Sequence, residues 1–373
     1  MATVGATTAP STNTVYYDSL LSTTLFNYRD VLYDNIFKSS AFLTALRKAG
    51  GVEEINGGER IARQLMYADS GNVRSYQGYE VLDTTPADGF TQCFYEWREI
   101  AATISISRRE ERQNSGEAAI MDLLRQKTVQ AEMSLKEKVI TQILQGTVYS
   151  STFVPGANLQ DDANTRDLNP LGYFLPENPT ADPSRGGNVG NISRATYSWW
   201  RPITAGLGAA GMTSDTFTLN CTTLRGLKMG LYRVWNHCSK GADGSGPNLI
   251  VSDQVSYETY ENSLDYDKRY TDTDMAEMGF DTIRLKGGTF VWDELVPDVK
   301  SGTTTLTYGT AFFLNTKFFK LFVDAQTNFV TTPFQEAFGQ TARTAKVLFM
   351  GNTGITNMRK NGVAGEISLS ITS

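Results

Sequence analysis

The chain has 373 residues, of which 40% are hydrophobic and 20% charged, a composition typical of folded proteins that argues against global disorder. A formal net charge of −6 argues against a protein that coats nucleic acid or anionic membrane, because those partners favour positive fields. No apolar run is long enough to cross a bilayer and the first residues lack the features of a signal peptide, so we expect a cytoplasmic product without a membrane partner.

The cysteines and the histidine limit the chemistry of the chain. Cys93, Cys221 and Cys238 are widely spaced and form no CxxC pair, which predicts neither a disulfide framework nor a zinc site. His237 is the only histidine, so any site that needs a histidine base must use it. It stands near the end of an expected helix, a position typical of a C-terminal cap.

The N-terminal part predicts an arm followed by helices. Residues 1–19 are small and polar and indicate a flexible segment. From 20 to 49 apolar residues recur at helical spacing, and Gly50 and Gly51 close the second of the expected helices.

Residues 51–110 predict a β-hairpin in which two long strands pair and flank an extended loop. Apolar residues alternate along 61–67 and again along 100–107, whereas 69–89 is polar and too long for an ordinary hairpin turn. The loop cannot bury its own apolar side chains, so we expect them to rest on another subunit. These side chains are Tyr76, Tyr79, Val81 and Leu82.

A long helix is predicted within 111–150. Asn114 and Glu117 resemble a capping box and Gly146 ends the helix, which would span roughly 40 Å. Directly before it, the run RREERQ contains Arg108 and Arg109. Its two glutamates favour a surface ion-pair run at the base of the loop over a nucleic-acid site.

The second half of the chain changes character at residue 216. Residues 151–215 carry little periodicity, but their aromatic residues favour an ordered irregular segment over a disordered linker. Residues 216–325 are α/β: a helix in TTLRGLKMGLYRVWNHCSKG, a buried strand in PNLIVSD and a helix after a Ser252/Asp253 cap. A hairpin turning at Gly287-Gly288 and one strand in TAFFLNTKFFKLFVD follow, and more strands come after 326.

No stretch carries a recognisable catalytic, cofactor or metal site. GADGSGPN lacks Lys-Ser/Thr and precedes a strand, so a solvent turn fits it better than a phosphate loop. The acidic run 265–277 lacks the glycine and spacing of an EF-hand, which favours a solvated loop, with opportunistic cation binding as the alternative. We therefore expect no enzyme activity and a chain built for assembly.

The order of these elements resembles that of tailed-phage major capsid proteins with the Hong Kong 97-type fold, over residues 20–370. The segment GNISRATYSWWRP (190–202) is similar to a G-x-I-x-R-x-x-x-x-x-W segment in one branch of these proteins. NLIVSDQVSYETYENSL and KVLFMGNTGITN resemble the strand-turn-helix and a late strand of the same branch. The ordered combination is more specific than any one of these motifs.

The resemblance implies a mixed α+β fold and a structural role. The implied protein is a virion protein that self-assembles through hexamers and pentamers into an icosahedral shell. Assembly would take place in the host bacterial cytoplasm. The shell would enclose double-stranded DNA and contact it only non-specifically. The implied parts are an N-terminal arm and helix (1–50), an extended loop (51–110), a peripheral-domain spine helix (111–150), a loop-rich insertion of the peripheral domain (151–215), an axial domain (216–325) and return strands (326–373).

Some members of the family join subunits by an isopeptide bond from a lysine on the extended loop. This chain has no lysine between Lys48 and Lys127, so we expect non-covalent stabilisation, with a separate decoration protein as an option. The short start implies a separate scaffolding protein, and a portal protein is a further implied partner. Two alternatives stay open: an encapsulin-like nanocompartment around a cargo enzyme, and a polysaccharide-active enzyme with sugar-stacking aromatics in YSWW.

Trp199 and Trp200 are adjacent in the 190–202 segment. In an extended chain they would point to opposite sides, one packing inward and the other against a neighbouring segment or subunit. We expect Arg194 to pair with a nearby carboxylate. These three residues are therefore interpreted as the contacts that fix an irregular loop in place.

Overall fold

The computed structural model describes residues 40–82, 85, 88–113, 123–145, 166–176, 188–206, 216–218, 224–241, 244–264, 283–296, 299–300, 307–336 and 341–368. The expected arm (1–19) and the acidic run 265–277 lie outside these residues. The described residues form two compact units. The larger takes its residues from 38–101, 135–330 and 348–373, and the smaller from 102–134 and 331–347.

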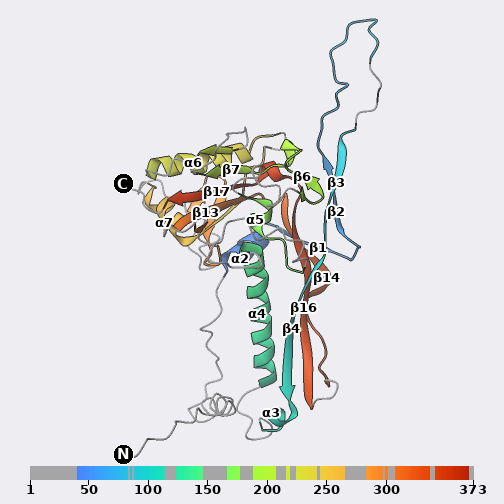
Figure 1. Ribbon diagram of the computed structural model, residues 1–373, viewed down its shortest axis with the longest axis vertical. Helices are drawn as coiled ribbons and strands as arrows, with labels where there is room; N and C mark the ends of the chain where they lie inside the picture. Colours follow the sequence, from blue (N-terminus) through green and yellow to red (C-terminus); the bar gives the residue numbers. More distant parts are fainter. Residues whose placement is uncertain are drawn as a thin grey trace, which may run out of the picture. The chain divides into compact units, whose positions relative to one another are not determined.

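An eight-stranded mixed sheet lies in the larger unit (Figure 1). Its order is β10-β11-β9-β13-β17-β7-β8, with β12 beside β13. β13 runs antiparallel to β9 and β17, whereas β11 is parallel to β9, and β7 is parallel to β17 and β8. The strands are Ile203–Gly206 (β7), Thr216–Thr218 (β8), Leu249–Ser252 (β9), Ile283–Leu285 (β10), Gly288–Trp292 (β11), Val299–Lys300 (β12), Thr307–Leu314 (β13) and Gly362–Ser368 (β17).

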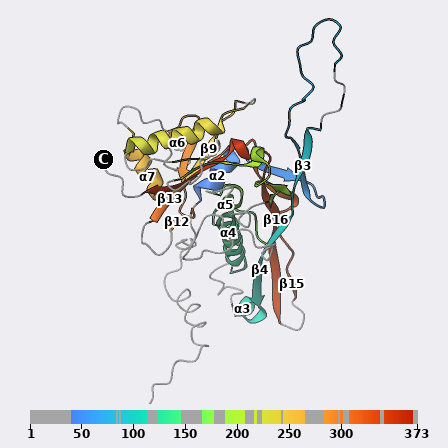
Figure 2. The same ribbon diagram turned by 45° about the horizontal axis from the view of Figure 1, so that its top comes forward.

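Two helices pack on this sheet and on each other (Figure 2): α6 (Leu224–Cys238) and α7 (Gln254–Asn262). Both match the predicted periodicity. Asp253 caps α7 by accepting a hydrogen bond from the Ser256 amide, as the sequence predicts. β9 is buried along its whole length, which explains its continuous apolar sequence. His237 lies in the last turn of α6, as expected for a C-terminal cap.

The predicted hairpin and the strand after it differ in detail from the structure. β10 and β11 pair as predicted, but the turn residues are Lys286 and Gly287, because Gly288 already pairs with Leu285. TAFFLNTKFFKLFVD forms two strands, the end of β13 and the start of β14 (Phe319–Thr331). Asn315 separates them. Its main-chain carbonyl accepts from the backbone N–H groups of Phe318 and Phe319, and its side-chain oxygen accepts from the Lys317 N–H, so the chain turns there.

The second sheet has the order β1-β14-β16-β15, and β4 also pairs with β16. In the larger unit, β1 (Val52–Ile55) runs parallel to β14, with Val52 opposite Leu321. In the smaller unit, β15 (Gln335–Glu336) runs antiparallel to β16 (Ala342–Ile355). β4 (Arg98–Ser107) keeps the predicted alternation, with its buried side chains, Ile104 and Ile106, on one face.

Three helices complete these parts of the chain. α2 (Ala41–Lys48) is the second predicted N-terminal helix, and its first turn is held by Asp293, which accepts from the Ser40 hydroxyl at 2.7 Å. α3 (Arg108–Gln113) is formed by RREERQ. α4 (Leu123–Leu144) is the described part of the predicted long helix. The proposed capping box at Asn114 lies outside the described residues.

The predicted pairing of the two long strands is wrong. β2 (Ile61–Met66) pairs with a further strand, β3 (Phe90–Tyr95), whereas β4 belongs to the other sheet. Which strand a given strand pairs with is a non-local property, so the alternation along β2 and β4 did not reveal it.

The irregular stretch 151–215 is ordered where it is described. It contains α5 (Leu171–Phe174), the strands β5 (Asn188–Val189) and β6 (Ile192–Ser193), and the 3₁₀ helix η4 (Ser198–Trp200). The last of its described elements is β7, which belongs to the eight-stranded sheet. The domain boundaries drawn from the sequence stay a prediction.

Candidate assembly surface

The loop between β2 and β3 is the principal candidate surface. The ladder ends at the Met66–Phe90 pair, and one further bond follows, from the Tyr67 amide to the Gly89 carbonyl at 2.9 Å. Figure 1 shows both strands continuing into a long loop. Beyond Gly89, the limbs are joined by side-chain bonds to main-chain carbonyls: Arg74 donates to Val81 and Asn72 to Thr85.

The four loop residues singled out from the sequence are exposed in the single chain. The exposed fractions are 65% for Tyr76, 105% for Tyr79, 87% for Val81 and 46% for Leu82. Several large apolar side chains exposed within one short segment are typical of an interaction site. The contact with another subunit stays a prediction.

The sequence analysis missed a second apolar pair at the base of the loop. Met66 and Phe90 lie opposite each other across β2 and β3 and are 76% and 74% exposed. They border a surface cavity of about 500 Å³, which Tyr67 and Gly89 also line. The available signal was the alternation itself, because Met66 has the opposite parity to the buried Ile61 and Leu65.

The segment 188–206 anchors the base of the loop. Gly190 and Asn191 form the turn between β5 and β6 with positive φ angles of 60° and 68°. The Gly190 carbonyl accepts from the Phe94 amide of β3 at 3.2 Å. A Cβ atom at Gly190 would lie only 2.9 Å from the Cβ of Cys93, so this close approach requires glycine.

The expectation that Trp199 and Trp200 lie in an extended chain is wrong. Ser198–Trp200 form the 3₁₀ turn η4, in which successive side chains are rotated by about 120°. Trp200 is 1% exposed, and its indole N–H donates to the Val189 carbonyl at 2.9 Å. Trp199 is half-buried and stacks on Tyr67, with ring centroids 5.5 Å apart and planes 21° apart. Trp199 therefore contacts the start of the extended loop.

Arg194 is bonded to main-chain carbonyls. Its side chain is fully buried and donates to the carbonyls of Phe174 at 3.0 Å and Tyr173 at 2.7 Å. The expected pairing with a carboxylate stays a prediction. Burial lowers the pKa of Arg194 to about 10, so the guanidinium stays charged at neutral pH. Arg194 thereby ties the 188–206 segment to α5, using acceptors that a sequence does not display.

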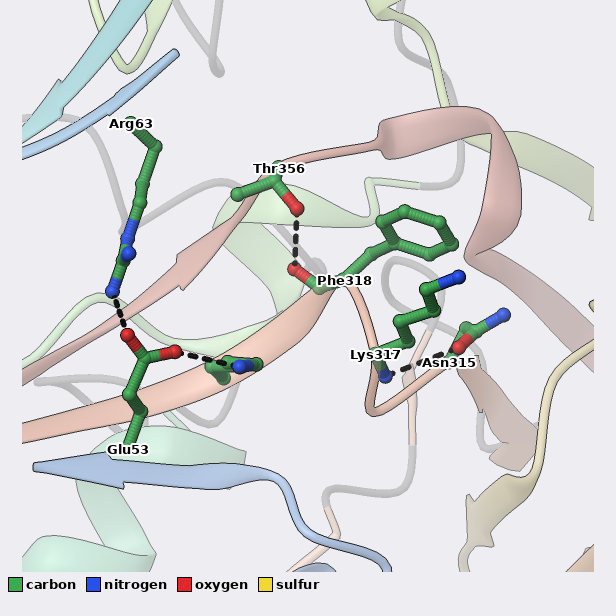
Figure 3. Close-up of polar contacts among 7 residues, drawn as sticks. Glu53, Arg63, Asn315, Lys317, Phe318 and Thr356 are labelled. Carbon is green, nitrogen blue, oxygen red and sulfur yellow. Dashed lines mark hydrogen bonds and ion pairs between the residues drawn. The ribbon is translucent and has the colours of Figure 1, made fainter. Parts of the chain in front are cut away.

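An ion-pair cluster joins three strands below the loop. Glu53 of β1 accepts from Arg63 of β2 and from Lys320 of β14, and Figure 3 shows the Arg63 and Glu53 side chains facing each other. The Arg63 guanidinium also lies 4.7 Å from the ring centroid of Phe322. Burial alone would raise the pKa of Glu53, but the hydrogen bonds and charges of Lys320 and Arg63 outweigh it and lower that pKa.

Arg108 and Arg109 lie in the smaller unit and are not part of the loop anchor. Both are exposed on α3, and Arg108 forms an ion pair with Glu336. Glu110 of the same helix pairs with Lys127 at 3.1 Å. RREERQ thus contributes to two ion pairs, and its interpretation as a surface ion-pair run stays a prediction.

The described residues include no group of three or more His, Cys, Asp or Glu side chains placed to hold a metal. Cys93 and Cys238 are buried free thiols, and burial raises the pKa of Cys93 to about 11. No helix in the described part of the chain is long and apolar enough to cross a membrane.

Comparison with solved structures gives the fold. The cyanophage A-1(L) capsid matches with a TM-score of 0.61 and 13% identity, covering 94% of this chain and 98% of that one. The capsid of the native GTA particle matches with a TM-score of 0.56 and 12% identity, covering 91% and 95%. The capsid of Myoviridae phage XM1 matches with a TM-score of 0.51 and 11% identity, covering 91% and 96%.

No family model matches the sequence, and no curated protein does. At such low identity the likeness establishes the fold alone. The chain thus has the fold of phage capsid proteins, which confirms the expected α+β capsid fold.

Proposed function

We propose that this chain is the major capsid protein of a tailed phage. It is a structural protein that self-assembles through hexamers and pentamers into an icosahedral shell around double-stranded DNA. The observation that carries the proposal is the capsid fold, which extends over at least 91% of the chain in each of the three likenesses. Fold alone does not determine function, so the proposal also needs a surface suited to assembly.

The extended loop supplies such a surface. Its apolar side chains are exposed at the end of two strands whose base is held by Trp199, Gly190 and the Glu53 ion pairs. A rigid base presents the loop in one direction, and covering its apolar side chains releases ordered water. A second copy of the chain is the partner that a closed symmetric shell requires.

Electron microscopy of the purified full-length protein tests the proposal. We expect closed icosahedral particles, and in infected cells particles filled with DNA. A protein that stays monomeric at every concentration and ionic strength would contradict the proposal. Shells that instead enclose a cargo enzyme would indicate a nanocompartment.

A matched pair of substitutions tests the role of the loop. Val81→Ser and Val330→Ser make the same change at exposed positions, 87% and 44% exposed, inside and outside the loop. Neither should change the unfolding midpoint of the chain, because neither side chain is buried. Only Val81→Ser should lower particle yield, measured by sedimentation. Equal yields for the two variants would refute the role of the loop.

The partners and the mode of stabilisation follow from the same proposal. The absence of lysine between Lys48 and Lys127 means that no lysine of the loop is available for an isopeptide bond. Mature particles boiled in denaturant should therefore give a single band at the mass of one chain, whereas a ladder of covalent multimers would contradict this. Separate scaffolding, portal and decoration proteins are further proposed partners.

A further inference from the structure

The exposed face of α6 is basic. Helical periodicity places its polar residues on the side opposite the buried Leu227, Leu231 and Val234. Arg233 and Lys240, which is just past the helix end, lie on this exposed side, and the half-buried Lys228 lies at its edge. A fourth cation, Lys286, joins them from the β10–β11 turn. We call these four residues the basic face.

Lys286 is held on α6 by three contacts. Its ammonium donates to the Asn236 side-chain oxygen and lies 5.2 Å from the ring centroid of Tyr232 and 5.1 Å from that of Trp235. Its backbone has a φ of 55°, a conformation that costs energy for a residue other than glycine. The turn thus presents a lysine beside the exposed side of the helix.

No carboxylate neutralises this face from its own helix. Residues 216–242 contain no Asp or Glu, although the whole chain has a net charge of −6. Within the part of the chain that the structure describes, Lys228, Arg233 and Lys240 form no ion pair, whereas Lys127 and Lys320 both do. Several cations on one face create a local positive field in an acidic protein.

We propose that the basic face binds the phosphate backbone of duplex DNA. This inference rests on the proposed function, in which the basic face is the surface of the capsid subunit that contacts the packaged DNA. Lys228 and Lys240 are about 18 Å apart along the helix axis, a length over which duplex DNA carries roughly ten charges. Met229 is the strongly exposed apolar side chain of this face, at 49%, which is too little apolar surface for the core of a protein interface.

The test compares two charge-matched double variants of the full-length protein. Lys228→Gln with Arg233→Gln removes two cations from the basic face, and Lys136→Gln with Lys138→Gln removes two exposed cations from α4. Binding of a fluorescent duplex of about 30 base pairs is measured by anisotropy between 50 and 200 mM salt, a range chosen because phosphate contacts are strongly salt-dependent. Polyglutamate is the second probe, and circular dichroism checks folding.

We expect four phosphate contacts in the unmodified protein, hence about a 150-fold loss of affinity over this fourfold rise in salt. The α6 variant should lose only about 12-fold over the same range and bind DNA more weakly, with the α4 variant unchanged. Equal effects of the two variants, no DNA binding, or polyglutamate binding as tight as DNA binding would overturn the inference. Shell formation is measured separately. If the protein forms shells but the α6 variant binds DNA as tightly as the unmodified protein, this inference alone is refuted. If the unmodified protein forms no shells, the proposed function is refuted.

Discussion

Replacement of the buried indole of the 188–206 segment should destabilise the chain strongly. Trp200 is 1% exposed, and truncation to alanine of a large aromatic side chain in a core costs about 3–5 kcal/mol of unfolding free energy. The change also removes the donor to the Val189 carbonyl, which lies 2.9 Å from the indole nitrogen. Trp200→Phe keeps most of the ring but leaves this carbonyl without that donor, for an expected cost of about 1–3 kcal/mol.

Substitution of the neighbouring Trp199 tests the position of the loop separately from the stability of the chain. Trp199→Ala removes the stack on Tyr67, a contact worth about 0.5–1.5 kcal/mol beyond the buried area, so its effect on unfolding should be smaller. Because the stack holds the start of the loop, trypsin should cleave this variant faster at Arg74, the one Lys or Arg between 67 and 89.

Guanidinium unfolding followed by circular dichroism measures the stability of each variant, and a timed digest measures the cleavage rate at Arg74. The expected order of destabilisation is Trp200→Ala, then Trp200→Phe and Trp199→Ala. A cost below about 1 kcal/mol for Trp200→Ala would refute the reasoning, because no buried indole with a bonded N–H is removed so cheaply. Unchanged cleavage in Trp199→Ala would refute the role assigned to the stack.

Three further predictions concern the segment 188–206 and the strands β1 and β3 near the base of the loop. Gly190→Ala should cost at least about 1–2 kcal/mol from its positive φ alone, whereas Gly71→Ala, with no atom within 4 Å of the added Cβ, should be nearly neutral in the same unfolding assay. The lowered pKa of Glu53 means that its ion pairs stabilise the chain above the unfolded pKa and are lost as pH falls through the folded pKa. At neutral pH the unfolding free energy of Glu53→Gln should be about 1 kcal/mol lower than that of the unmodified chain. This difference should disappear as the pH falls below the ordinary pKa of 4.5. The buried Cys93 should react with iodoacetamide at pH 8 far more slowly in the native chain than in urea. The extent of reaction is measured from the mass of the Cys93 peptide, and equal rates in the two conditions would contradict its burial.

The elements that the sequence predicted well are those specified by local periodicity. α6, α7 and β9 are each set by a pattern that one segment carries by itself, and the Asp253 cap follows its helix by a fixed offset. Pairing is different. Nothing in the alternation of β2 indicates that its partner is β3 and not β4, because both candidates offer a half-buried face.

The candidate site was predicted by composition but not by geometry. The exposed loop residues could be identified because a polar segment cannot bury its tyrosines. The orientation of the tryptophan pair could not, because a 3₁₀ turn and an extended chain are both compatible with the sequence SWWRP. Arg194 illustrates the same limit: it donates to the carbonyls of Tyr173 and Phe174, and every residue has a carbonyl.

The free chain must tolerate an apolar loop until a neighbour covers it. Tyr79 and Val81 are almost fully exposed, and such side chains favour aggregation as readily as assembly. Asp69 and Glu80 lie exposed on the same loop, and the whole chain carries a net charge of −6, so two free loops repel each other electrostatically. The bonds from Arg74 to Val81 and from Asn72 to Thr85 join the two limbs through side chains, which occupies carbonyls that a second strand would otherwise use. Charge and these bonds therefore disfavour loop-to-loop pairing, and leave the correctly shaped surface of another subunit as the favourable contact for the apolar side chains.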